Sequence, residues 1–342
     1  MPSTYAHRRF GANVLEHLPD EVRVQLEMNR ELYDIGLHGP DLLFYYHAAK
    51  SNPVGALGNA MHEEPGRVFF DRARRVVHCE ADRDAALAYA LGFVCHFALD
   101  STCHPYVEQY VRTSGVSHCE IETEFDNQLL RREGRDPLHD LTASHIQPSR
   151  IWANVVAPFY EGVTVDEVYQ AMTGMVFVHK MLLASNPVKR WVVLTAIRAA
   201  GKWEFMHGLV ANPQPNPQCT ESGKQLDALY QSAIPLAVRL INEYVAGLDT
   251  DAPLDAETTY TVTFSDPQAG NSFSWSLDAE GICRLDGIEG NCRMVSTGVG
   301  SLPAYCHDVL ELYCRASRTA RNYDAQGRWL GWDLVPDTVA PG

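Results

Sequence analysis

Apolar residues recur at helical spacing through most of the first 250 residues. Segment 83–104 is apolar on nearly all sides, which predicts a helix at the centre of a bundle. We expect the Pro/Asn-rich segment 211–218 to be a loop that joins two helices. The helical spacing is clearest, with few Gly or Pro residues inside, in segments 20–34, 83–104, 117–132, 164–184, 188–208 and 221–247.

The pattern changes after residue 250. Short stretches there alternate apolar and polar residues, and turn-forming sequences such as DPQAGN and DGIEGN separate them. They predict a small antiparallel sheet or a set of hairpins over 256–300, with one further helix over 304–320. The sequence therefore predicts a mainly α protein with a helical domain, 1–250, and a small β-rich C-terminal region of unknown role, 251–342.

Composition and charge narrow the classes of function. The chain has 342 residues and a formal net charge of −15, from 28 basic and 43 acidic residues. Such a chain has no general affinity for nucleic acids or anionic membranes, although bound divalent cations would create a local positive site. The first residues form no apolar signal-like stretch, and the nine cysteines include no C-x-x-C pair. We expect a cytoplasmic protein without a membrane span or a thiolate zinc ribbon, with secretion as the alternative.

The most informative segment carries His96, Asp100 and His104, each four residues from the next. Residues four apart lie on one face of a helix, so these side chains form one stripe on the most apolar predicted helix. Burying a carboxylate and two imidazoles without partners costs several kcal/mol. A divalent cation offsets this cost, because carboxylate and neutral imidazole are its ligands. We expect Pro105 to end the helix next to His104.

A second pair and three isolated residues extend this pattern. His118 and Glu122 are also four apart, so they can hold one metal ion from a single helical face. Alone, the pair is more typical of a solvated acidic helix face; beside the preceding stripe it indicates a metal site. His7, Asp41 and His62 are weak signals singly, since a lone His is more often a surface or core residue and an Asp after Gly-Pro is more often a turn or cap.

In chain order these motifs resemble the zinc-dependent phospholipase C family, whose helical fold is shared with the single-strand-specific zinc nucleases. The motifs are a His, Gly-Pro-Asp, Met-His, H-x-x-x-D with a further His, and H-x-x-x-E. The resemblance implies a multi-helix bundle and about two to three zinc ions. The ligands that it implies are His7, Asp41, His62, His96, Asp100, His104, His118 and Glu122.

The resemblance also divides these ligands among three ions. The first ion would bind the three ligands that come last in the chain, His104, His118 and Glu122. The second would bind three ligands from separate segments, Asp41, His62 and His96. Asp100 would bridge this ion to the third, which also takes His7. In the family the N-terminal residue, typically Trp, completes the third site, whereas this chain has no Trp before His7.

The implied reaction is cleavage of the glycerol-side phosphate ester of a phospholipid by a metal-activated water. Asp41 is the residue expected to combine metal ligation with general-base catalysis. The expected partners are a phospholipid or another phosphate diester, together with transient contact with a membrane surface. No stable nucleic-acid partner is expected. Two alternatives stay open: a nuclease or nucleotidase on the same fold, and a zinc-binding interaction protein without activity.

Overall fold

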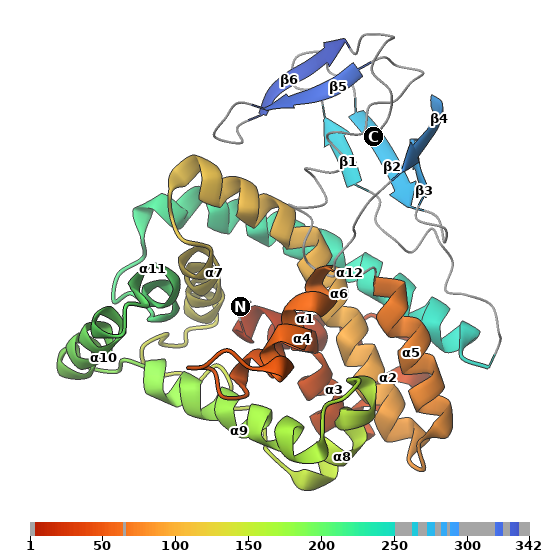
Figure 1. Ribbon diagram of the computed structural model, residues 1–342, viewed down its shortest axis with the longest axis horizontal. Coiled ribbons are helices and arrows are strands. Elements are labelled where there is room, and N and C mark those ends of the chain that lie inside the picture. The colour runs from red at the N-terminus through yellow and green to blue at the C-terminus, as the bar shows by residue number, and fades with distance from the viewer. Residues whose placement is uncertain are drawn as a thin grey trace.

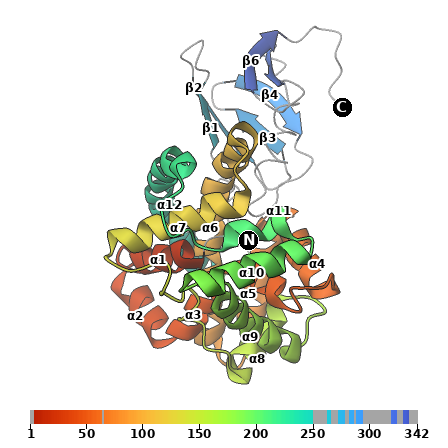
Figure 2. The ribbon, with the colours of Figure 1, turned by 90° about the vertical axis from the view of Figure 1, so that its left-hand side faces the viewer.

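The computed structural model describes residues 4–63 and 66–249, together with the strands of the C-terminal region. The helices form a bundle around one long central helix (Figures 1 and 2). The α-helices are α1 (Thr4–Leu15), α2 (Asp20–Met28), α3 (Arg30–Gly36), α4 (Pro53–Glu63), α5 (Gly66–Cys79), α6 (Arg83–Ser114), α7 (His118–Arg132), α8 (Arg150–Val156), α9 (Val165–Leu182), α10 (Pro187–Ala199), α11 (Trp203–Met206) and α12 (Thr220–Gly247). The 3-10 helices are η1 (Gly39–Tyr45), η2 (Ala157–Phe159), η3 (His207–Leu209) and η4 (Pro217–Cys219). The mainly α prediction is confirmed.

The central helix is α6, as its nearly all-round apolar sequence predicts. Every residue from Ala85 to Ser101 is buried, and α1, α3, α5 and α12 pack against the helix. Helices α3 and α6 meet at Gly36 and Gly92, where a Cβ added to either glycine would lie 2.2 Å from a carbonyl oxygen of the other helix. Of the described helices, α6 is the one long and apolar enough to span a membrane, but 94% of its apolar window is buried inside the protein. It is therefore placed as a core helix.

The prediction that Pro105 ends this helix is wrong. Helix α6 continues through Pro105 to Ser114 and ends at Gly115, which has a left-handed φ of 73°. Proline removes one backbone N–H, and a long, well-packed helix tolerates the loss of that one hydrogen bond. The extra turns carry Glu108, which contacts the metal centre described below.

Two other predicted helices are broken. Segment 20–34 divides into α2 and α3 at Asn29, whose φ of −117° and ψ of 37° lie outside the helical range. Segment 188–208 divides into α10 and α11, since Gly201 adopts a left-handed φ of 66° between them. The predicted helices over 117–132, 164–184 and 221–247 correspond to α7, α9 and α12, and the loop over 211–218 leads into α12 through η4.

The C-terminal region contains strands, as its alternating pattern predicts. Four of them form an antiparallel sheet in chain order: β1 (Val262–Ser265), β2 (Ser272–Leu277), β3 (Ile282–Leu285) and β4 (Ile288–Arg293). Strands β5 (Thr319–Tyr323) and β6 (Trp329–Leu334) form an antiparallel pair. Most of the helix predicted over 304–320 lies outside the described residues, and its last two positions belong to β5. The domain division at residue 250 stays a prediction.

Candidate metal centre

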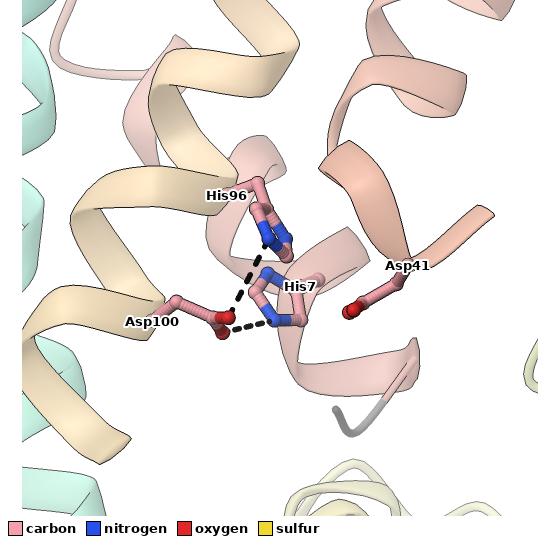
Figure 3. Close-up of side chains that lie close together, drawn as sticks. All are labelled: His7, Asp41, His96 and Asp100. Carbon is pink, nitrogen blue, oxygen red and sulfur yellow. Dashed lines mark ion pairs between the residues drawn. The ribbon is translucent and has the colours of Figure 1, made fainter. Parts of the chain in front are cut away.

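Three helical elements bring four buried ligand side chains together. His7 comes from α1, Asp41 from η1, and His96 and Asp100 from α6. Each offers a ligand atom, and these atoms all lie within 4.8 Å of one another. Figure 3 shows His7, His96 and Asp100 gathered on one side, with the Asp41 carboxylate directed toward them from the other. We call this set the first cluster.

Asp100 lies between the histidines of the first cluster. Its Oδ1 is 3.0 Å from His7 Nε2, and its Oδ2 is 3.4 Å from His96 Nε2. Oδ2 also lies 3.6 Å from His104 Nε2, one turn further along α6. Two ligands of one tetrahedral zinc ion, with bonds of about 2.0 Å, are separated by about 3.3 Å. The two carboxylate oxygens therefore face different imidazoles at separations that suit two neighbouring ions.

His62 approaches Asp41 from α4. Its Nδ1 donates a hydrogen bond to the Gly58 carbonyl oxygen, one turn earlier, at 2.6 Å. This bond directs Nε2 toward Asp41, whose Oδ1 lies 3.1 Å away. The ring also stacks on Phe44, with centroids 5.5 Å apart. His62 is thus held by its other nitrogen and by an aromatic ring, as is usual for a metal-binding histidine.

Gly39 allows η1 to approach His96 closely. It has a left-handed φ of 47°, and a Cβ at this position would lie 2.2 Å from the His96 ring. Its carbonyl oxygen accepts a hydrogen bond of 2.8 Å from the Tyr160 hydroxyl, which lies 2.6 Å from the Tyr89 hydroxyl. The Gly-Pro-Asp motif therefore does more than form a turn, because it fits Asp41 against the central helix.

The second cluster joins α6 to α7. His104, His118 and Glu122 offer ligand atoms that lie within 4.8 Å of one another. Glu122 Oε1 is 3.0 Å from His118 Nε2 and 3.4 Å from His104 Nε2. The other ring nitrogen of His118, Nδ1, lies 3.0 Å from Glu108 Oε1. Glu108 thereby orients His118 so that Nε2 points into the cluster.

Burial and ion pairing set the protonation of these groups. Burial lowers the pKa of His96 to about 4, which keeps its imidazole neutral and able to bind a metal. Burial also favours neutral carboxyl groups, but the imidazoles of His104 and His96 hold the pKa of Asp100 well below its usual range. Burial opposes protonation of His118, yet Glu122 and Glu108 raise its pKa to about 10. A cation that binds here would replace this proton.

Several buried polar atoms of the clusters make no hydrogen bond within the described part of the chain. Unpaired buried polar atoms are costly, and divalent cations would pair with the carboxylates and with one nitrogen of each imidazole. Burial raises the pKa of the neighbouring thiols of Cys103 and Cys119, which keeps them protonated. The donor set is thus imidazole and carboxylate, which suits zinc. The atoms without hydrogen bonds are His7 Nδ1, Asp41 Oδ2, His96 Nδ1 and Nε2, Asp100 Oδ2, His118 Nε2 and Glu122 Oε2.

One comparison with known proteins bears on this centre. Residues 6–163 match the model of the family described as zinc-dependent phospholipase C. Over this segment the chain is similar to that family. It contains every residue of both clusters and His62. No curated protein and no solved structure matches the chain.

All eight residues singled out in the sequence lie in or beside the two clusters of the matched segment. The clusters adjoin through the 3.6 Å approach of Asp100 to His104. His7 lies with Asp41 and His96 in one group, although the resemblance assigns it to a different ion. His62 reaches the first cluster through Asp41. That all eight bind zinc stays a prediction.

The sequence did not predict two positioning roles, that of Glu108 and that of Asp126, which extends the stripe of His118 and Glu122 by one turn. Glu108 continues the stripe of His96, Asp100 and His104 by one further turn, but the expected helix end at Pro105 hid it. Asp126 accepts hydrogen bonds from the backbone N–H groups of Tyr5 and Ala6, at 2.9 and 2.7 Å. It thereby caps the first turn of α1 and places His7. No sequence signal connects Asp126 to a helix more than 100 residues away.

Proposed function

We propose that this chain is a zinc-dependent phospholipase C that cleaves phospholipids at the glycerol-side phosphate ester. The proposal rests chiefly on two adjoining clusters within the matched segment, the first buried and the second partly buried, which approach each other through Asp100. We propose about two to three zinc ions per chain. Their ligands would be the seven residues of the two clusters together with His62.

Zinc in these clusters would bind the phosphate oxygens, stabilise charge on the attacking and leaving oxygens, and bring the pKa of a bound water near 7. The residues of the chain supply position and proton transfer. Asp41 Oδ1 faces His62, whereas Oδ2 is buried and makes no hydrogen bond within the described residues. Oδ2 is therefore available to accept a proton from the attacking water, so we assign Asp41 as the general base. Because water attacks the phosphorus, the reaction needs no Ser, Cys or Lys nucleophile.

The same arrangement explains how an acidic chain can bind a substrate anion. The chain has a net charge of −15, and the Asp41, Asp100 and Glu122 carboxylates add negative charge at the site itself. Two or three divalent cations would carry about +4 to +6, which exceeds the charge of these three carboxylates. Affinity for the phosphate diester should therefore require metal. This requirement supports a metal-dependent hydrolase over a general anion-binding protein.

The test is hydrolysis by zinc-loaded protein of two substrates in parallel: a short-chain, water-soluble phosphatidylcholine and single-stranded DNA. Release of phosphocholine and diacylglycerol, abolished by a chelator and restored by zinc, is the expected result. Cleavage of DNA alone would replace the proposal with a nuclease of the same fold. Cleavage of neither substrate by fully loaded protein would favour a zinc-binding interaction protein without activity.

A further inference from the structure

Helix α10 exposes an apolar stripe that the fold does not use. Val188, Trp191 and Val192 occupy neighbouring positions on one helical face, at i, i+3 and i+4. Their side chains are 73%, 68% and 50% exposed. The opposite face already packs inward, because Ile197 is buried in a small core with Leu182 of α9. Helix α10 is thus apolar on two faces, and only one of them is covered by described residues.

The end of α9 extends the exposed surface. Phe177 and Met181, one helical turn apart, are 64% and 41% exposed. Exposed large apolar side chains are normally scattered singly over a protein surface. Five of them occur on two consecutive helices, which indicates an interaction site. We call this surface, formed by Phe177, Met181, Val188, Trp191 and Val192, the α9–α10 face.

The segment 168–203, which contains the face, has a charge opposite to that of the chain. No Asp or Glu occurs between Glu167 and Glu204, although the chain has 43 acidic residues and a net charge of −15. The segment between these two glutamates carries five basic residues, Lys180, Lys189, Arg190, Arg198 and Lys202. A basic surface with exposed aromatic and aliphatic side chains complements an anionic lipid surface, since the bilayer interface takes up the apolar groups and the head groups attract the cations.

Helices α9 and α10 are linked by contacts to η1 and to α7, which both carry proposed metal ligands. Helix α9 touches η1, which carries Asp41: a Cβ on Gly174 would lie 2.2 Å from the Tyr45 carbonyl oxygen. Arg190 of α10 donates to Asn212 Oδ1 at 2.8 Å, and Asn212 donates in turn to a carboxylate of α7. Figures 1 and 2 show the positions of α9 and α10 in the bundle, with α10 next to α11 in Figure 1. The two helices that carry the face therefore contact elements of the metal centre.

We propose that the α9–α10 face docks the protein on an anionic phospholipid bilayer. The inference rests on the proposed function, since it names the form in which the phospholipid is met, but docking itself needs no catalysis. Trp191 and Phe177 insert at the head-group level, and the exposed basic residues of the segment, Lys180, Arg198 and Lys202, contact lipid phosphates. The local positive charge thus overcomes the repulsion that the acidic remainder of the chain experiences at such a surface.

Binding is measured by co-sedimentation with vesicles of phosphatidylcholine containing phosphatidylglycerol, using zinc-loaded protein in a chelator-free buffer. The double variant V188S/V192S should lower the vesicle partition coefficient about tenfold, since two side chains leave the interface. The matched control is V24S/M28S on α2, which removes two exposed apolar residues at the same spacing. It should bind as the unaltered protein does. Lys180→Glu should weaken binding to anionic vesicles at low salt and have little effect at high salt.

Three results would refute docking through this face. The first is unchanged vesicle binding by V188S/V192S, and the second is an equal loss of binding in the α2 control. The third is that the unaltered chain is a dimer and V188S/V192S is a monomer, which would make the face a contact between two copies of the chain. Hydrolysis of the short-chain soluble phospholipid separates this proposal from the proposed function. Soluble substrate cleaved at the same rate by both double variants, with slower cleavage of vesicles by V188S/V192S alone, supports docking. Vesicle binding without cleavage of any phospholipid leaves docking in place and refutes the phospholipase.

Discussion

Asp100→Asn is the substitution with the largest expected effect on the metal centre. The side chain is buried, and its two oxygens face His7 at 3.0 Å and His96 at 3.4 Å. Asparagine keeps the shape but replaces one oxygen by an NH₂ group, which cannot bind a cation. The ions of the first cluster lose both a shared ligand and the charge that reduces their mutual repulsion. We therefore expect zinc to fall by more than one ion per chain.

The effect on stability follows from linkage. An ion present at about 1,000 times its dissociation constant stabilises the native state by about 4 kcal/mol. Loss of two such ions removes about 8 kcal/mol of the zinc-dependent stabilisation, which is comparable with the entire free energy of unfolding of an ordinary domain. The second cluster keeps all three of its own ligands, His104, His118 and Glu122. About one ion per chain should therefore remain bound.

The assay is zinc per folded chain by elemental analysis, combined with urea unfolding with and without zinc. The matched control is Asp34→Asn, since Asp34 is also a buried carboxylate but pairs with Arg30 at 2.7 Å on α3. The control should keep its zinc content, and any change in its free energy of unfolding should be the same with and without zinc. If Asp100→Asn also kept its full zinc content, Asp100 would be an ordinary buried residue and the bridging role would be refuted.

Three further predictions use the same measurements. Glu122→Gln should remove about one ion, because Glu122 belongs to the second cluster alone; loss of all zinc would contradict the division into clusters. Glu108→Gln should weaken zinc binding at His118 about 10- to 100-fold in a competition titration, and unchanged affinity would show that the 3.0 Å contact does not orient the ring. Deleting 252–342 should leave a folded, zinc-loaded helical domain, because every proposed ligand lies before residue 123; an insoluble or zinc-free fragment would place the domain boundary elsewhere.

Helical periodicity predicted the part of the site that one helix supplies. His96, Asp100 and His104 lie on one stripe of α6 because spacing by four is enough to place them there. The same spacing places Glu108 on this stripe, but the helix-breaking tendency of Pro105 predicts a helix end before it. Packing against neighbouring helices instead continues α6 to Ser114. Burial among four other helices stabilises α6 by more than one missing N–H costs.

The relative placement of separate helices could not be predicted from local patterns. His7 joins the first cluster because Asp126 of α7 caps the first turn of α1. Asp41 joins it because Gly39 leaves room for the His96 ring. Both contacts are tertiary and span long separations in sequence, so neither produces a periodic signal. In the sequence, only the resemblance to the zinc-dependent phospholipase C family connected these residues.

The fold and the metal centre depend on each other because they share α6. The helix is buried from Ala85 to Ser101, so His96 and Asp100 occupy positions that apolar side chains would otherwise fill. The His7–Asp100 ion pair holds part of this polar set without metal, but both nitrogens of His96 make no hydrogen bond within the described chain. Zinc would satisfy His96 and connect α6 to η1 through Asp41. Removal of zinc should therefore loosen first the contacts of α1 and η1 with α6, while the apolar packing of α3 and α12 on the same helix persists.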